Sequence, residues 1–96
     1  MNVGDQFNLR STFRNPFASA TTIHFDVPAA GAHVKLEVFD AVGRHVATLL
    51  DGWVSGPQTL RWTACDDGGR HMRSGLYLCR LAAADRSETL KLMLLR

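Results

Sequence analysis

The 96-residue sequence contains few of the features that define specialised classes of protein. It has only two cysteines, Cys65 and Cys79, whereas a disulfide scaffold of this size usually carries more. No apolar run approaches the ~18 residues of a membrane span, and the N-terminus has no apolar stretch of the signal-peptide kind. If the protein is exported, we therefore expect its export signal to lie elsewhere, on a larger precursor.

The excess of positive over negative charge is also small. The formal net charge is only +2, and the lysines and arginines are scattered along the chain rather than clustered. This distribution does not indicate a nucleic-acid partner, and solubility is the simpler explanation of the mild basicity. The apolar and charged fractions, 46% and 21%, are typical of a globular protein, so we expect one domain with a core of its own.

No segment of useful length shows helical periodicity. Apolar and polar residues alternate instead, which is the pattern of a strand with one buried face. Glycine- and proline-rich stretches separate these segments, and Pro16, Pro28 and Pro57 lie at segment ends, where no ladder hydrogen bond is lost. The pattern predicts strands at residues 22–27, 33–38, 46–50, 58–63, 76–81 and 89–95, and an additional strand near residues 7–13.

This succession of short strands predicts an all-β fold, an antiparallel sandwich of about seven strands. Each alternating strand has one apolar face, such as Ile23, Phe25 and Val27, and two sheets packed face to face supply the surface that buries it. Residues 33–50 are predicted to form a hairpin whose turn contains Gly43, where a positive φ is expected.

The sequence has no motif of a catalytic or metal-binding site. No serine lies in a G-x-S-x-G elbow. The four histidines lack the spacing of a metal site: His24, His33, His45 and His71. Cys65 is near His71, but the spacing is too loose to indicate a Cys–His pair, and a thiol in a polar turn is the simpler interpretation. We therefore expect a binding, structural or targeting module, not an enzyme, with no cofactor.

Three features leave alternatives open. The segment Asp66-Asp67-Gly68-Gly69 is typical of a tight turn, with a weak calcium site at the two carboxylates as the alternative. Cys79 lies in an apolar strand pattern and is expected in the core, with a disulfide to Cys65 as the alternative. Trp62 is expected in the core, whereas Trp53 lies in a loop and offers a face on which a sugar ring could stack.

Several ordered motifs resemble those of two related families. They occur in NPFASATTIHFDVPAAGAHVKLEVFDAVGRHVATLLDG, TLRWTACDDGGRHMRSGLYLCRL and ETLKLMLLR, which together reach from residue 15 to residue 96. The chain resembles the type A C-terminal sorting domain of the bacterial type IX secretion system and the immunoglobulin-like domain of the flagellar hook-capping protein. The matching residues are Asn15, Pro16, Phe17, Gly43, Arg44, Trp62, Asp66, Asp67, Gly68, Gly75 and Tyr77. The chain departs from the pattern where Ala18-Ser19-Ala20 replaces a second Asn-Pro and where Cys79 replaces a common aromatic residue.

The resemblance implies an immunoglobulin-like domain over residues 15–96, after a linker or extra N-terminal strand over residues 1–14. It also implies a non-catalytic targeting function. Such a domain is carried at the C-terminus of a larger secreted bacterial protein, and outer-membrane secretion machinery recognises it and moves the cargo from the periplasm to the cell surface. The final strand is apolar and terminal, so Lys91, Leu92, Leu94 and Arg96 are the candidates for receptor recognition.

Two other functions stay open at this point. The domain could be a structural accessory module, either in a hook-capping-like assembly or as a spacer that contacts neighbouring domains of the same precursor. It could also be a carbohydrate-binding module that uses Trp53 and the loops around it.

Overall fold

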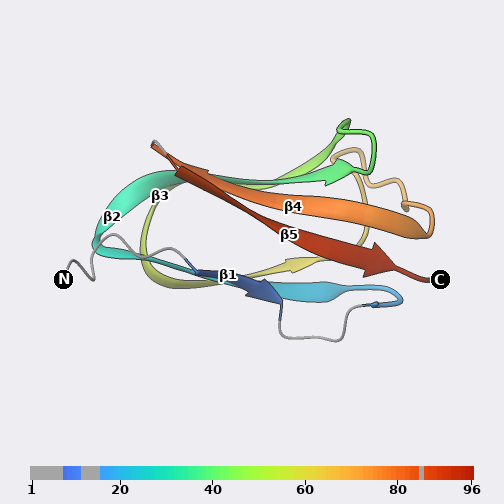
Figure 1. Cartoon of the computed structure of the whole chain (residues 1–96), viewed down its shortest axis with the longest axis horizontal. Helices are drawn as coiled ribbons and strands as arrows, with labels where there is room; N and C mark the ends of the chain where they lie inside the picture. The colour runs from blue at the N-terminus through green and yellow to red at the C-terminus, as the bar shows by residue number, and fades with distance from the viewer. Residues whose placement is uncertain (1–7, 12–15, 85) are drawn as a thin grey trace.

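The computed structural model describes residues 8–11, 16–84 and 86–96, and these residues form an antiparallel all-β fold (Figure 1). Five strands share one hydrogen-bonded sheet: β1 (Asn8–Ser11), β2 (Thr21–Asp40), β3 (His45–Trp62), β4 (Gly75–Ala83) and β5 (Arg86–Leu94). The order is β1-β2-β4-β5, and β3 pairs with β2 along its other edge. The prediction of an all-β antiparallel fold is confirmed.

The long strands β2 and β3 bend together, and the sheet folds over into two layers as a result. Residues 21–27 of β2 pair with residues 56–62 of β3, whereas residues 32–39 pair with residues 45–54. The register shifts between Val27 and Ala32, where the two strands turn in Figure 1. One layer contains β1 and the first half of β2, and the other contains the second half of β2 with β4 and β5.

The predicted count of about seven strands is not confirmed, because the bend does not end either long strand. The sequence separates residues 22–27 from residues 33–38 at Pro28-Ala29-Ala30-Gly31, but the structure keeps both within β2. Gly31 has a φ of +87°, which lets the backbone turn sharply while it stays in the sheet. The same holds for β3, where Gly56 has a φ of +72° opposite Val27.

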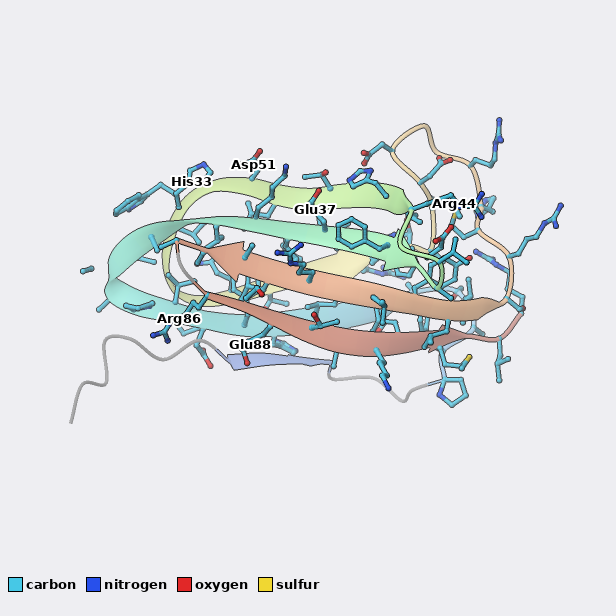
Figure 2. All side chains as sticks on the ribbon, turned by 45° about the horizontal axis from the view of Figure 1, so that its top comes forward. His33, Glu37, Arg44, Asp51, Arg86 and Glu88 are labelled. Atoms are coloured by element: carbon cyan, nitrogen blue, oxygen red, sulfur yellow. The ribbon has the colours of Figure 1, made fainter. Side chains whose placement is uncertain are left out.

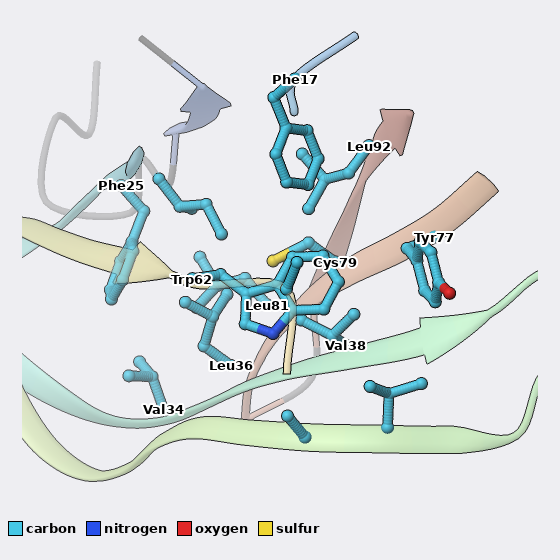
Figure 3. Close-up of a cluster of buried hydrophobic side chains, with 14 of the residues drawn as sticks. Phe17, Phe25, Val34, Leu36, Val38, Trp62, Tyr77, Cys79, Leu81 and Leu92 are labelled. Carbon is cyan, nitrogen blue, oxygen red and sulfur yellow. The ribbon is translucent and has the colours of Figure 1, made fainter. Parts of the chain in front are cut away.

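The core lies between the two layers and is built from the inward faces of the strands (Figure 3). The buried pattern alternates in β2 as predicted, with Ile23, Phe25 and Val27 in one layer and Val34, Leu36 and Val38 in the other. The strands β4 and β5 add Tyr77, Cys79, Leu81, Leu92 and Leu94. Burial of this apolar surface stabilises the fold by roughly 25 cal/mol per Å².

Candidate functional site

Phe17 joins a segment near the beginning of the described fold to its end. The Phe17 N–H donates to the Met93 carbonyl at 2.9 Å, and the Leu95 N–H donates to the Phe17 carbonyl at 2.9 Å. Phe17 thus forms a parallel bridge with Leu94. Pro16 precedes it at an exposed position, and Asn15 lies outside the described residues.

The three aromatic motif residues pack together in the core. The Phe17 ring packs edge to face on Trp62, with 5.9 Å between the ring centroids, and Trp62 packs in the same way on Tyr77, with 5.4 Å between the centroids (Figure 3). The polar ends are satisfied, because the Trp62 indole N–H donates to the Cys65 carbonyl at 2.9 Å and the Tyr77 hydroxyl donates to the Arg73 carbonyl at 2.7 Å. Burial raises the pKa of Tyr77 above its ordinary value. These motif residues therefore fix the loop that follows β3.

The turn between β2 and β3 is organised by Asp40. One carboxylate oxygen accepts hydrogen bonds from the backbone N–H groups of Val42 at 3.0 Å and Arg44 at 2.9 Å. The other oxygen accepts a hydrogen bond from the Arg44 Nε–H at 2.8 Å. The Asp40 N–H donates to the Arg44 carbonyl, and the Gly43 N–H donates to the Asp40 carbonyl. The backbone N–H of Arg44 is the first cause that holds the pKa of Asp40 below its ordinary value. Gly43 has the predicted positive φ, +89°.

The loop after β3 repeats this turn at Asp66. Its Oδ1 accepts the N–H groups of Gly68 at 3.0 Å and Arg70 at 2.8 Å. The Asp66 N–H donates to the Arg70 carbonyl, and the N–H of Gly69, whose φ is +84°, donates to the Asp66 carbonyl. The two turns therefore have the same backbone hydrogen bonds and the same aspartate cap.

Sequence reasoning missed this equivalence, although the signal is present. The segments DAVGRH (residues 40–45) and DDGGRH (residues 66–71) share aspartate, glycine, arginine and histidine at the same four positions. Each shared residue except the histidine has an assigned place in the turn: the aspartate caps it, the glycine supplies the positive φ, and the arginine backbone closes it. We call these segments the first and second DxxGRH turns.

Asp67 has a different role from Asp66. Its Oδ1 accepts the Thr48 N–H at 3.0 Å, and its own N–H donates to the Val46 carbonyl at 3.2 Å. It therefore covers part of the β3 edge that β2 does not pair. The turn interpretation of Asp66 and Asp67 fits these bonds, and the described residues contain no group of three acidic, histidine or cysteine side chains placed to hold a metal ion.

The structure brings Cys65 and His71 together, which the sequence analysis did not expect. They form an isolated antiparallel bridge at the base of the second DxxGRH turn, and the Cys65 Sγ lies 3.5 Å from the His71 Nδ1. The flanking bonds run from the Asp66 N–H to Arg70 and from the Met72 N–H to Ala64. A pair flanked in this way brings its side chains close. Both cysteines are free thiols, so the alternative of a disulfide to Cys79 is not realised.

A shallow hollow of about 520 Å³ lies between the two DxxGRH turns. Three arginines line it, namely Arg44, Arg70 and Arg73, and Tyr77 lies at its base. Figure 2 shows Arg44 at this end of the molecule, and Figure 1 shows the C-terminus at the same end. The hollow adjoins the last residue of the chain, because Arg96 donates hydrogen bonds to Ser74 and Met72, which line it.

The four predicted recognition residues occupy unlike positions. Leu92 and Leu94 are both 0% exposed and belong to the core, so the folded chain does not present them to a receptor. Lys91 is exposed on the opposite face of β5. Arg96 is tied to the loop before β4: its N–H donates to the Ser74 Oγ at 2.8 Å and its Nε to the Met72 carbonyl at 2.9 Å.

The outer face near the bend carries Trp53, His33 and Asp51. Trp53 is 68% exposed, as predicted, but it lies within β3 and not in a loop, because β3 continues through the bend. Its indole lies so close to Gly31 that a Cβ on that residue would clash with the indole nitrogen. His33 pairs with Trp53 across the strands and lies 3.3 Å from the Asp51 carboxylate (Figure 2). Trp62, by contrast, is 2% exposed and belongs to the core, as predicted.

This fold occurs in solved proteins of Porphyromonas gingivalis. The chain matches dimeric latent PorU with a TM-score of 0.74 and 21% identity, over 93% of this chain and 9% of that one. It also matches PorZ, described as an essential bacterial surface component of the type-IX secretion system, with a TM-score of 0.63 and 15% identity. This match covers 92% of this chain and 11% of PorZ. The chain therefore spans about a tenth of the length of each. No protein-family model and no curated protein matches the sequence.

The described residues include no helix with the length and hydropathy needed to cross a membrane.

Proposed function

We propose that the chain is a non-catalytic C-terminal sorting domain of the type IX secretion system, with an immunoglobulin-like sandwich fold. The likeness to PorU and PorZ carries this proposal, because the same fold occurs there as a small part of much longer chains. The order of the sequence motifs adds support, since Phe17, Trp62 and Tyr77 form one contact network and Gly43 and Arg44 form one turn. The domain would be carried by a larger secreted protein and recognised by outer-membrane secretion machinery.

A structural accessory module is the second candidate. The same observation supports it, because a domain that spans about a tenth of its structural relatives suits a spacer or a contact between neighbouring domains. The two candidates differ in one respect, since only a sorting domain moves an unrelated cargo across the outer membrane.

A reporter fusion tests the proposal. The reporter carries an N-terminal export signal and this chain at its C-terminus, and it is expressed in a bacterium that has a type IX system. We expect the reporter outside the outer membrane, and we expect it to stay in the periplasm in a strain that lacks the outer-membrane translocon. A folded fusion that stays in the periplasm of the competent strain would contradict sorting and favour the accessory module.

The structure also constrains how this test is designed. Truncation before Lys91 would delete Leu92 and Leu94 from the core, so retention of a truncated fusion would report unfolding rather than a lost signal. Surface substitutions that leave the core intact are the better variants.

A further inference from the structure

We propose that the hollow between the two DxxGRH turns docks an acidic segment of a partner protein. The inference rests on the proposed function in one respect, because that partner would belong to the secretion machinery. It places recognition on the two turns, which the sequence indicated only as turns and family motifs, rather than on the core residues of β5.

The charge of the hollow is the first argument. Its lining includes three arginines, Arg44, Arg70 and Arg73, and two aspartates, Asp40 and Asp66. Both carboxylates accept hydrogen bonds within their own turns, and Asp40 also pairs with Arg44. In the part of the chain that the structure describes, Arg70 and Arg73 are exposed and have no carboxylate at ion-pair distance. Two guanidinium groups are thus left to attract acidic side chains.

The apolar residues of the hollow favour a protein partner over a simple polyanion. Val42 is 76% exposed and lies on its wall, beside half-buried Met72 and Leu76. Arginine, methionine and tyrosine are enriched at protein interfaces, and this hollow has all three. A segment that alternates carboxylate and aliphatic side chains would satisfy both the guanidinium groups and the apolar wall.

The surface is held in place before any partner arrives. Each DxxGRH turn is closed by four hydrogen bonds between its aspartate and its backbone. Arg96 holds the loop that contains the second DxxGRH turn, because its guanidinium donates to the carbonyls of Met72 at 2.9 Å and Ala64 at 3.3 Å. Since little backbone must be ordered on binding, contacts here cost little conformational entropy. Arg96 positions this surface and is not expected to touch the partner.

Fluorescence anisotropy with a defined probe tests the surface directly. The probe is a fluorescein-labelled peptide of alternating glutamate and leucine, and its control has glutamine in place of glutamate. We expect the wild-type chain to bind only the glutamate peptide, and R70Q/R73Q to bind it about tenfold more weakly, since each exposed ion pair contributes modestly. R61Q/R80Q removes two exposed arginines outside the hollow and should bind within twofold of wild type.

Three results would overturn the proposal. The first is that the wild-type chain does not bind the glutamate peptide, and the second is that both double variants lose affinity for it equally. The third is that a single-stranded DNA probe binds the wild-type chain as tightly as the peptide does and that both double variants lose this binding equally. The last two outcomes would mean general attraction between opposite charges. Thermal melts of both variants show that each remains folded.

The reporter fusion separates this inference from the proposed function. If the wild-type fusion is exported, the R70Q/R73Q fusion should stay in the periplasm while the R61Q/R80Q fusion is exported, and equal export of all three would overturn the docking surface. If the wild-type fusion is not exported, the sorting function fails, and the peptide measurement alone decides the surface.

Discussion

At the scale of the single residue, Phe17 joins segments that are far apart in the chain. Its backbone bridges Leu94 and its ring contacts Trp62 from the end of β3. It is 6% exposed, although no strand of the fold contains it. We therefore expect Phe17 to contribute to the free energy of unfolding through both its backbone hydrogen bonds and its buried ring.

We expect Phe17→Ala to lower the free energy of unfolding by about 3–5 kcal/mol, because it leaves a cavity beside Trp62. Urea denaturation followed by tryptophan fluorescence measures the loss. Phe39→Ala is the matched control and should cost less, since Phe39 is half-buried and packs on His45 outside the core cluster. An equal cost for the two variants would contradict the role of Phe17.

The two thiols should differ in reactivity. Cys65 is partly exposed and lies beside His71, whereas Cys79 is 0% exposed and burial raises its pKa to about 12. With an aromatic disulfide reagent at neutral pH, we expect one thiol to react in the native protein and two in denaturant. Cys65→Ser should abolish the native reaction, and Cys79→Ala should keep it. A reactive thiol in folded Cys65→Ser would refute this assignment.

At the scale of the element, the bend in β2 and β3 decides how five strands make two layers. Trp53 covers Gly31 at this bend, and Gly31 has a positive φ. A side chain at position 31 would therefore meet two penalties, one from the backbone and one from the indole.

Gly31→Ala should destabilise the fold more than Gly43→Ala. Gly43 has nearly the same φ, +89°, but a Cβ there meets nothing within 4 Å, so its cost is the backbone term of roughly 1–2 kcal/mol. Gly31→Ala adds the displacement of Trp53, which should also shift the tryptophan fluorescence. In a Trp53→Ala background, the two glycine substitutions should cost the same. A persistent difference there would mean that something other than the indole sets the cost.

The strand faces could be predicted from the sequence, whereas the strand ends could not. Alternation identified Ile23, Phe25 and Val27 as a buried face, because side-chain period is a local property. Whether Gly31 ends a strand or bends it depends on the pairing of residues 32–39 with β3, which is not local. The Cys65–His71 pair was missed for the same reason, since it needs the turn at Asp66 to bring the two residues together.

At the scale of the whole molecule, the core responds to alkaline pH. Cys79 has an ordinary pKa of 9.0 when unfolded and about 12 when folded. Well below pH 9 its thiol is protonated in both states, so there it adds no pH dependence to stability. Above pH 9 the unfolded state loses its proton first, which favours unfolding until the folded thiol also ionises.

We therefore expect the free energy of unfolding to fall as pH rises from 9 toward 12, with a slope of up to ~1.4 kcal/mol per pH unit from this thiol. Tyr77 acts in the same direction above pH 10.0, because its pKa is also raised. Chemical denaturation at a series of pH values measures the slope. Cys79→Ala should flatten the curve between pH 9 and 10, and an unchanged slope in that variant would contradict the assignment to Cys79.

The bridge between Phe17 and Leu94 also has a mechanical consequence. The two segments run parallel, one near the beginning of the described fold and the other near its end. Tension that draws the N-terminal side of Phe17 away from the C-terminal side of Leu94 would load both backbone hydrogen bonds together, in shear. They would then share the force rather than open one after the other, so a pull that has already separated β1 from β2 would meet both of these hydrogen bonds at once.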